Sequence, residues 1–119
     1  RRKEVYGALL RPGLDGRSEE LISVQLGGPQ AWFEQLASRP DCASGVVLCG
    51  DGARLYAELA RDLLGTRAHI ADAIPMGASV AWMARDSIRR LAEGEQGEDA
   101  LRPLYMRDHD AAISRAAAK

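Results

Sequence analysis

A short apolar run, followed at once by a glycine-rich turn and a helical pattern, constrains this chain most. Residues 45–49 are apolar throughout, which is typical of a β-strand covered on both faces. Gly50, Asp51 and Gly52 then turn the chain, and apolar residues recur at helical spacing over residues 55–64 until Gly65. The pattern predicts a central strand, a tight turn with Asp51 as N-cap, and a helix.

Further elements alternate along the rest of the chain. Residues 4–11 and 21–26 read as two strands, and the turn residues between them predict an antiparallel hairpin. A short helix beginning at Pro29 should follow, then a short strand at residues 69–71 and an amphipathic helix over residues 80–91. These elements predict an α/β fold, with a mixed sheet that starts with the hairpin and is flanked by helices.

Length and composition limit the classes of protein to consider. The 119 residues predict one domain over 1–119, and 46% apolar with 28% charged residues favour a folded chain. Because 16 basic residues nearly balance 17 acidic ones, direct binding to nucleic acid or anionic lipid is disfavoured. The absence of a long apolar run and the presence of only two cysteines favour a cytoplasmic protein without a membrane span.

The turn after the central strand is the candidate binding site. Gly50, Asp51, Gly52 and Ala53 could bring backbone amides close to a phosphate at a helix N-terminus, with Asp51 or Arg54 as polar contacts. The same residues also suit a plain tight turn with an N-cap, because neither a Walker lysine nor a third Rossmann glycine follows. We favour the plain turn and keep phosphate binding as the alternative.

Other chemistry-bearing residues give weaker indications. Two cysteines and two histidines could hold a metal, but their spacing matches no paired zinc signature (Cys42, Cys49, His69 and His109). Trp32 and Phe33 are adjacent, so both cannot face inward from one helix, and one of them is expected to contact something outside this chain.

Three segments in this order resemble one family: RRKEVY at residues 1–6, VLCGDGA at 47–53 and RPLYMR at 102–107. Together they resemble the C-terminal half of the TsaB/YeaZ family, accessory subunits in bacterial threonylcarbamoyladenosine synthesis on tRNA. The resemblance implies a ribonuclease-H-like half of the sugar-kinase, heat-shock-protein and actin superfamily. It also implies the C-terminal domain of a longer two-domain protein, with residues 108–119 as a frayed tail.

For function, the resemblance implies a scaffold and dimerisation subunit without catalytic residues or a cofactor of its own. A TsaD-like transferase and a TsaE-like ATPase would be its partners. These partners would carry the metal and ATP or ADP, and the subunit would reach tRNA only through their complex. A homodimer of the subunit is also compatible with the resemblance. In such a subunit the phosphate-type turn would be vestigial, and it consists of Gly50, Asp51, Gly52 and Ala53. The rival is a small nucleotide- or phosphate-binding enzyme that uses this turn.

Overall fold

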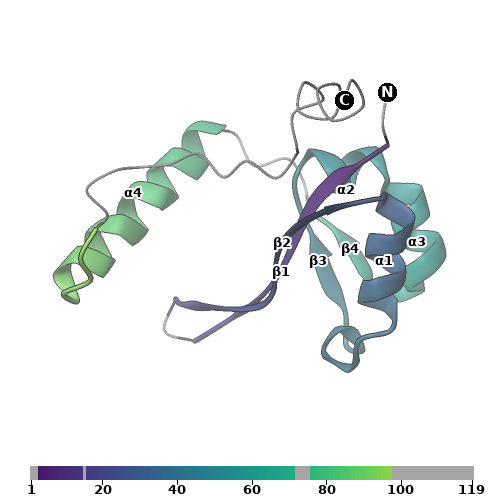
Figure 1. Cartoon of the computed structure of the whole chain (residues 1–119), viewed down its shortest axis with the longest axis horizontal. Coiled ribbons are helices and arrows are strands. Elements are labelled where there is room, and N and C mark those ends of the chain that lie inside the picture. The colour runs from purple at the N-terminus through teal and green to yellow at the C-terminus, as the bar shows by residue number, and fades with distance from the viewer. Residues whose placement is uncertain (1–2, 15, 72–75, 98–119) are drawn as a thin grey trace, which may run out of the picture. The chain divides into compact units, whose positions relative to one another are not determined.

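The computed structural model of the chain describes residues 3–14, 16–71 and 76–97 (Figure 1). The described residues fall into two compact units, one that ends at Ala71 and one that contains the long helix α4 (Met76–Ala92). The first unit holds the strands and the short helices. Mixed α/β composition is thereby confirmed, whereas the single domain over residues 1–119 stays a prediction.

The first unit begins with the predicted antiparallel hairpin of β1 (Val5–Pro12) and β2 (Ser18–Gly27). Exposure alternates over the first six residues of β1, as expected when one face of a strand lies against a core. The pairing register shifts on both sides of Leu9. Such irregularities bend a strand and increase its twist, so the hairpin is not a flat extension of the core.

Helix α1 (Pro29–Ala37) follows the hairpin and begins at proline, as predicted. Proline suits this position because its ring fixes a helical φ and the first turn needs no amide donor. Phe33 and Leu36 are buried, and Trp32 lies over Gly7 of β1. Phe33 therefore packs in the core and Trp32 packs against β1. Neither residue needs the contact with another molecule that was expected for one of them.

The predicted strand, turn and helix are β3 (Val46–Leu48), α2 (Asp51–Leu55) and α3 (Ala57–Leu64). The N-cap of α2 is Gly50 rather than Asp51, because the chain enters the helix with φ of 93° at this residue, a conformation that favours glycine. No side chain caps α2. Tyr56 separates the two helices, with φ of −111° and ψ of 28°.

The chain then returns to form the predicted short strand, β4 (Ala68–Ile70), which pairs in parallel with β3. Two short 3-10 turns complete the first unit, η1 (Pro40–Cys42) and η2 (Gly65–Arg67). The guanidinium of Arg67 donates to the carbonyl oxygens of Leu64 and Ala37, both at 3.2 Å. It thereby joins the C-terminal ends of α3 and α1.

The expectation of one mixed sheet needs correction within the described residues. β1 pairs with β2 and β3 with β4, and these form two separate two-stranded sheets. The expectation that residues 45–49 are covered on both faces is also wrong, because Val47 is 70% exposed. Among the described residues, helices cover only the face that holds Val46 and Leu48, and the hairpin does not pair with the parallel strands.

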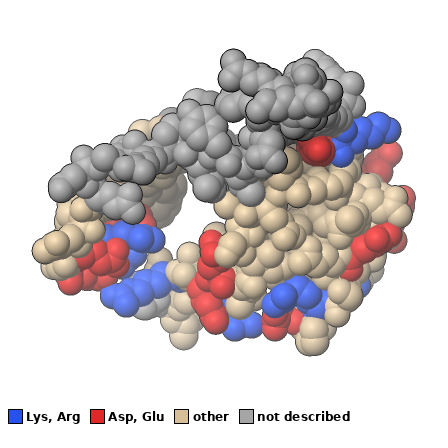
Figure 2. Space-filling view, in the orientation of Figure 1, with Lys and Arg blue, Asp and Glu red and all other residues tan. Residues whose placement is uncertain are grey.

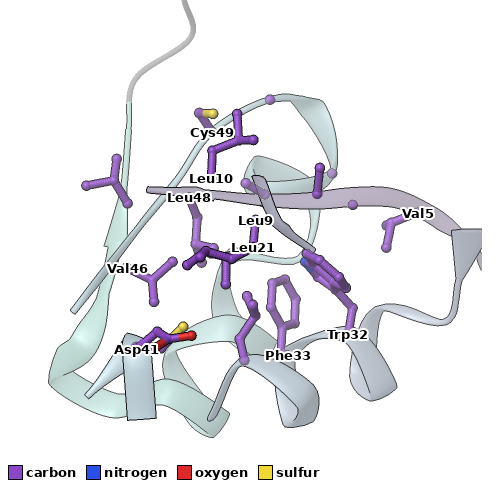
Figure 3. Close-up of a pocket in the computed structure, with 18 of the residues that line it drawn as sticks. Val5, Leu9, Leu10, Leu21, Trp32, Phe33, Asp41, Val46, Leu48 and Cys49 are labelled. Carbon is purple, nitrogen blue, oxygen red and sulfur yellow. The ribbon is translucent and has the colours of Figure 1, made fainter. Parts of the chain in front are cut away.

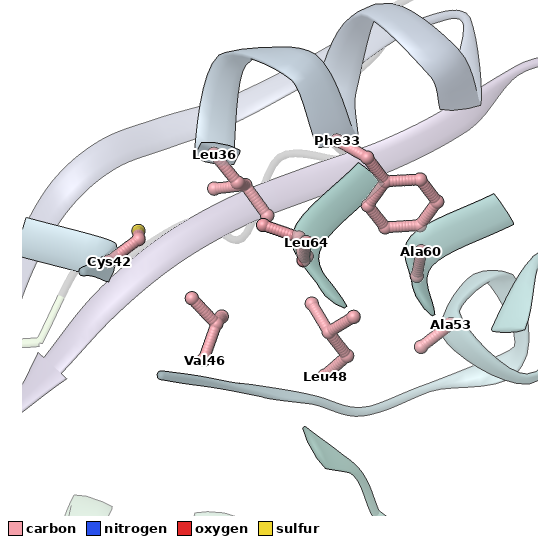
Figure 4. Close-up of a cluster of buried hydrophobic side chains, with 8 residues drawn as sticks. All are labelled: Phe33, Leu36, Cys42, Val46, Leu48, Ala53, Ala60 and Leu64. Atoms are coloured by element: carbon pink, nitrogen blue, oxygen red, sulfur yellow. The ribbon is translucent and has the colours of Figure 1, made fainter. Parts of the chain in front are cut away.

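The core of the first unit lies between β3 and the helices α1 and α3 (Figure 4). Phe33 and Leu36 come from α1, and Val46 and Leu48 point toward them from β3. The other buried members are small or aliphatic: Cys42, Ala53, Ala60 and Leu64. This core fixes the strand β3 and the helix α1, the two elements that border the candidate site.

The second unit contains α4, which confirms the predicted amphipathic helix over residues 80–91. Its polar side carries ion pairs between residues three or four positions apart, from Arg89 to Asp86 and Glu93 and from Arg90 to Asp86. Within the described ranges, no helix combines the length and hydropathy that a membrane crossing requires. The predicted extended segment at 102–107 and the tail at 108–119 lie outside those ranges.

Candidate functional site

An open pocket of about 520 Å³ lies in the first unit and is the candidate site (Figure 3). One side is β1 of the hairpin, and the other is formed by α1, β3 and the start of α2. We call this pocket the hairpin groove. It exists because the hairpin and the parallel pair form separate sheets, so apolar side chains between them are left partly accessible.

Apolar side chains form most of the hairpin groove. Leu9 and Leu21 reach into it from the hairpin, and Val46 and Leu48 line it from β3. Trp32 closes one end by lying against the backbone of Gly7. Figure 2 shows that the face of the first unit turned to the viewer is largely uncharged, with Lys, Arg, Asp and Glu along its margin.

Charged residues of the hairpin groove are paired with one another. Arg11 donates to Glu19 at 2.9 Å, across the hairpin, and to Asp41 of η1 at 3.3 Å. Asp41 also accepts a hydrogen bond from Arg39. These contacts join the end of β1 to η1, so the charges serve to connect two elements rather than to face an empty site.

Both cysteines line the hairpin groove, but their surroundings differ. Cys42 is 1% exposed, and burial raises the pKa of its thiol, an effect opposed by the nearby Arg39. Because the thiolate is the nucleophile, a raised pKa makes Cys42 less reactive at neutral pH. Cys49 is exposed.

The predicted phosphate-type turn lies at the edge of the hairpin groove. Gly50, Gly52 and Ala53 line it, and a side chain at Gly52 would come into ordinary contact with Val5 of β1. Ala53 is part of the buried core, whereas the exposed Asp51 places a carboxylate in the first turn of α2. The structure thus keeps the four residues in one turn, and their use as a phosphate site stays a prediction.

The four candidate metal ligands are not assembled in the part of the chain that the structure describes. That part contains no group of three or more His, Cys, Asp and Glu side chains placed to hold a metal ion. His69 lies on β4 with its ring beside Gly45, and His109 falls outside the described residues.

Two features of this site were not predicted from the sequence: the ion pair between Arg11 and Asp41, and the contact of Trp32 with Gly7. The glycine offered an indication, because an isolated glycine inside a strand often marks a close approach of another group. The ion pair between Arg11 and Asp41 could not be read from the sequence, since the two residues are 30 positions apart. Their contact depends on how the hairpin packs on η1.

Comparison with known proteins adds no assignment. No family model matches the sequence, and searches of curated proteins and of solved structures also give no match. The resemblance to the TsaB/YeaZ family therefore stays a prediction. Of its three segments, only 47–53 lies entirely within the described residues.

Proposed function

We propose that this chain is a non-catalytic scaffold domain in the complex that adds threonylcarbamoyl to the adenosine beside the tRNA anticodon. It would bind a TsaD-like transferase subunit, and a TsaE-like ATPase would dock on the pair. The partners would supply the metal, ATP and contact with tRNA, in the cytoplasm. The proposal rests on the resemblance of residues 1–6, 47–53 and 102–107 and on the character of the hairpin groove.

One observation carries the proposal: the hairpin groove is open and mostly apolar, and its main charges are already paired. An interface core has this character, with apolar side chains at the centre and polar groups at the rim. Leu10 and Val47 are 53% and 70% exposed, so a partner could contact them without rearranging the core. We assign the hairpin groove to contact with the transferase subunit.

The rival enzyme functions have less support from the same residues. A phosphate at the turn would meet the carboxylate of Asp51, and α2 has only five residues, so its N-terminus offers a weak dipole. A cysteine nucleophile would need a lowered pKa, whereas the pKa of Cys42 is raised. These observations favour the scaffold over the small phosphate-binding enzyme.

The test uses two exposed leucines as a matched pair. Leu10 lines the hairpin groove, and Leu55 is 75% exposed on α2 and does not belong to the groove lining. Leu10→Glu and Leu55→Glu would each be made in the chain joined to the N-terminal domain that the resemblance implies. Binding to a TsaD-like transferase from the same cell would be measured by pull-down and titration, together with tRNA modification.

We expect Leu10→Glu to weaken binding by at least about tenfold, because a charge would be buried in an apolar interface. Leu55→Glu should bind as the unchanged protein does. Equal effects of both substitutions would remove the hairpin groove from the interface. Absence of binding and of restored modification by the joined protein itself would refute the scaffold function, and saturable binding of ATP to the chain would then favour the phosphate-binding enzyme.

A further inference from the structure

The hairpin groove lies between two strand edges. It is lined by β3 but by no residue of β4, and by all of β1 but only Leu21 of β2. The groove therefore borders the edge of each strand that faces away from its own partner strand. All four strands belong to the first unit, so this arrangement does not depend on the position of α4.

The edge of β3 presents the main-chain groups of Val47. The carbonyl oxygen of Leu48 accepts a hydrogen bond from the amide of Ala71, just after β4, at 2.8 Å. In the parallel register of the two strands, Val46 and Leu48 thus direct their main-chain groups to β4, and Val47 directs its own to the opposite edge. Among the described residues, no strand pairs with that edge. The N–H and C=O groups of Val47 are therefore placed to pair with a further strand.

The separation of β1 and β3 leaves room for one strand. Neighbouring strands of a sheet lie about 4.8 Å apart, so two strands with a third between them are about 9.6 Å apart. Apart from isolated residue pairs, the Cα atoms of β1 are more than 8 Å from those of β3. The groove between them has a volume of about 520 Å³, within the range of pockets that enclose small ligands.

The walls of the groove favour a segment with apolar side chains. Four apolar side chains of the hairpin and β3 line it: Leu9, Leu21, Val46 and Leu48. The charged residues of the lining, Arg11 and Asp41, are paired with each other. A charged side chain that entered the groove would lose its hydration without gaining a free counter-charge there. An extended segment would instead direct every second side chain to these apolar walls.

We propose that the transferase partner contributes an extended segment that enters the hairpin groove as a strand beside β3. This segment carries apolar side chains at alternate positions, and its main chain pairs with the N–H and C=O of Val47. In such strand addition, main-chain hydrogen bonds give affinity and pockets for alternate side chains give specificity. The inference rests on the proposed scaffold function and adds to it the form in which the partner enters the groove.

Amide hydrogen exchange tests the main-chain pairing. Val47 and Leu48 are a matched pair, because the amide of Leu48 points to β4 and that of Val47 to the opposite edge. In the chain joined to the N-terminal domain, the protection factor of Val47 should be at least about tenfold below that of Leu48. Adding the TsaD-like transferase should raise it at least about tenfold and leave that of Leu48 nearly unchanged. Mass spectrometry with residue-level fragmentation measures both amides.

Two substitutions at one residue separate the main chain from the side chain. Val47→Pro removes the N–H at the free edge but not the pairing with β4, which Val46 and Leu48 make. Val47→Ala shortens the side chain and keeps the N–H. Val47→Pro should weaken transferase binding at least about tenfold relative to Val47→Ala, because an acceptor of the partner would be buried without a donor. Circular dichroism checks folding, and the exchange experiment decides if Val47→Pro does not fold.

The outcomes separate this inference from the scaffold function. Transferase binding that leaves the exchange of Val47 unchanged, or that Val47→Pro and Val47→Ala weaken equally, overturns the added strand and leaves the scaffold function standing. Slow exchange of Val47 in the absence of transferase also overturns it, because a segment of this chain or a second copy would then occupy the edge. Absence of transferase binding overturns both.

Discussion

Gly7 is the residue whose replacement most directly tests the packing of the hairpin on α1. A side-chain carbon at this position would lie 2.5 Å from Cε2 of Trp32 and 2.8 Å from two further ring carbons. The φ of Gly7 is not positive, so space rather than backbone conformation requires glycine here. Gly7→Ala therefore changes one contact, between the hairpin and the indole ring.

The magnitude follows from that distance. Ordinary contact of a side-chain carbon begins near 3.4 Å, so the ring would have to move by roughly 0.9 Å. Overpacking of this kind costs about 1–3 kcal/mol. Alanine also lowers the conformational entropy of the unfolded chain, and this stabilises the folded state by about 0.4–1 kcal/mol. We expect Gly7→Ala to lower the free energy of unfolding of the first unit by about 1–2 kcal/mol.

Urea unfolding followed by tryptophan fluorescence measures this change. The protein has two tryptophans, so Trp82→Phe makes Trp32 the reporter of the first unit. Gly27→Ala is the matched control, because Gly27 is also a strand glycine and a side chain there would meet nothing within 4 Å. Because no clash opposes the restriction of the unfolded chain there, Gly27→Ala should leave the free energy of unfolding unchanged or raise it by up to about 1 kcal/mol.

A double substitution checks the cause. In a Trp32→Leu background, followed by circular dichroism, the cost of Gly7→Ala should largely disappear, because the leucine leaves room for the new methyl group. The reasoning is refuted if Gly7→Ala is as harmless as Gly27→Ala. It is equally refuted if its full cost persists without the indole ring.

Asp41→Asn should lower the free energy of unfolding by about 0.5–1 kcal/mol, because it removes the ion pair with Arg11. This ion pair is largely at the surface, so the loss of stability should be smaller in high salt. A loss that urea titrations show to be independent of salt would contradict this. The pKa of Asp86 is held below its usual range by hydrogen bonds from two arginines one turn later. A depressed folded pKa stabilises α4 above the unfolded pKa, and this contribution is lost as the pH falls through the folded pKa. An NMR titration of the carboxyl group should therefore give a pKa below that of free aspartate, and Asp86→Asn should reduce the acid-induced loss of helix content. A thiol reagent should modify Cys49 rapidly and Cys42 only on unfolding, so two equally fast thiols in the native chain would contradict the buried position of Cys42.

Features set by local chemistry could be predicted from the sequence. Pro29 begins α1, Gly65 ends α3, and the turn residues before β2 join two strands into a hairpin. Each of these positions depends on the conformational preference of one or two residues. The elements were therefore predicted in the correct order and type, but not all of their bounds were correct. The one helix predicted over residues 55–64 is divided at Tyr56 into α2 and α3, the N-cap is Gly50, and β2 and α4 begin before residues 21 and 80.

Features set by contacts between distant segments could not be predicted. The apolar run around Val47 indicated coverage on both faces, but apolar composition does not tell which neighbours a strand acquires. The two strand pairs form separate sheets, and the register of β1 with β2 shifts on both sides of Leu9; the residue pattern of β1 indicates neither feature. The hairpin groove arises from that separation, so its turn residues were identified whereas its apolar walls were not.

The parallel pair also bears on the order in which the first unit folds. Val46 pairs with Ala68 across two helices, whereas Pro12 and Ser18 pair across a short turn. Closing the longer loop costs more chain entropy, so hairpin pairing can precede the parallel pair. Ala68 and Ile70 pack against the core only after α2 and α3 have brought β4 beside β3. Chains emerging from the ribosome therefore reach that stage only once Ile70 has been made.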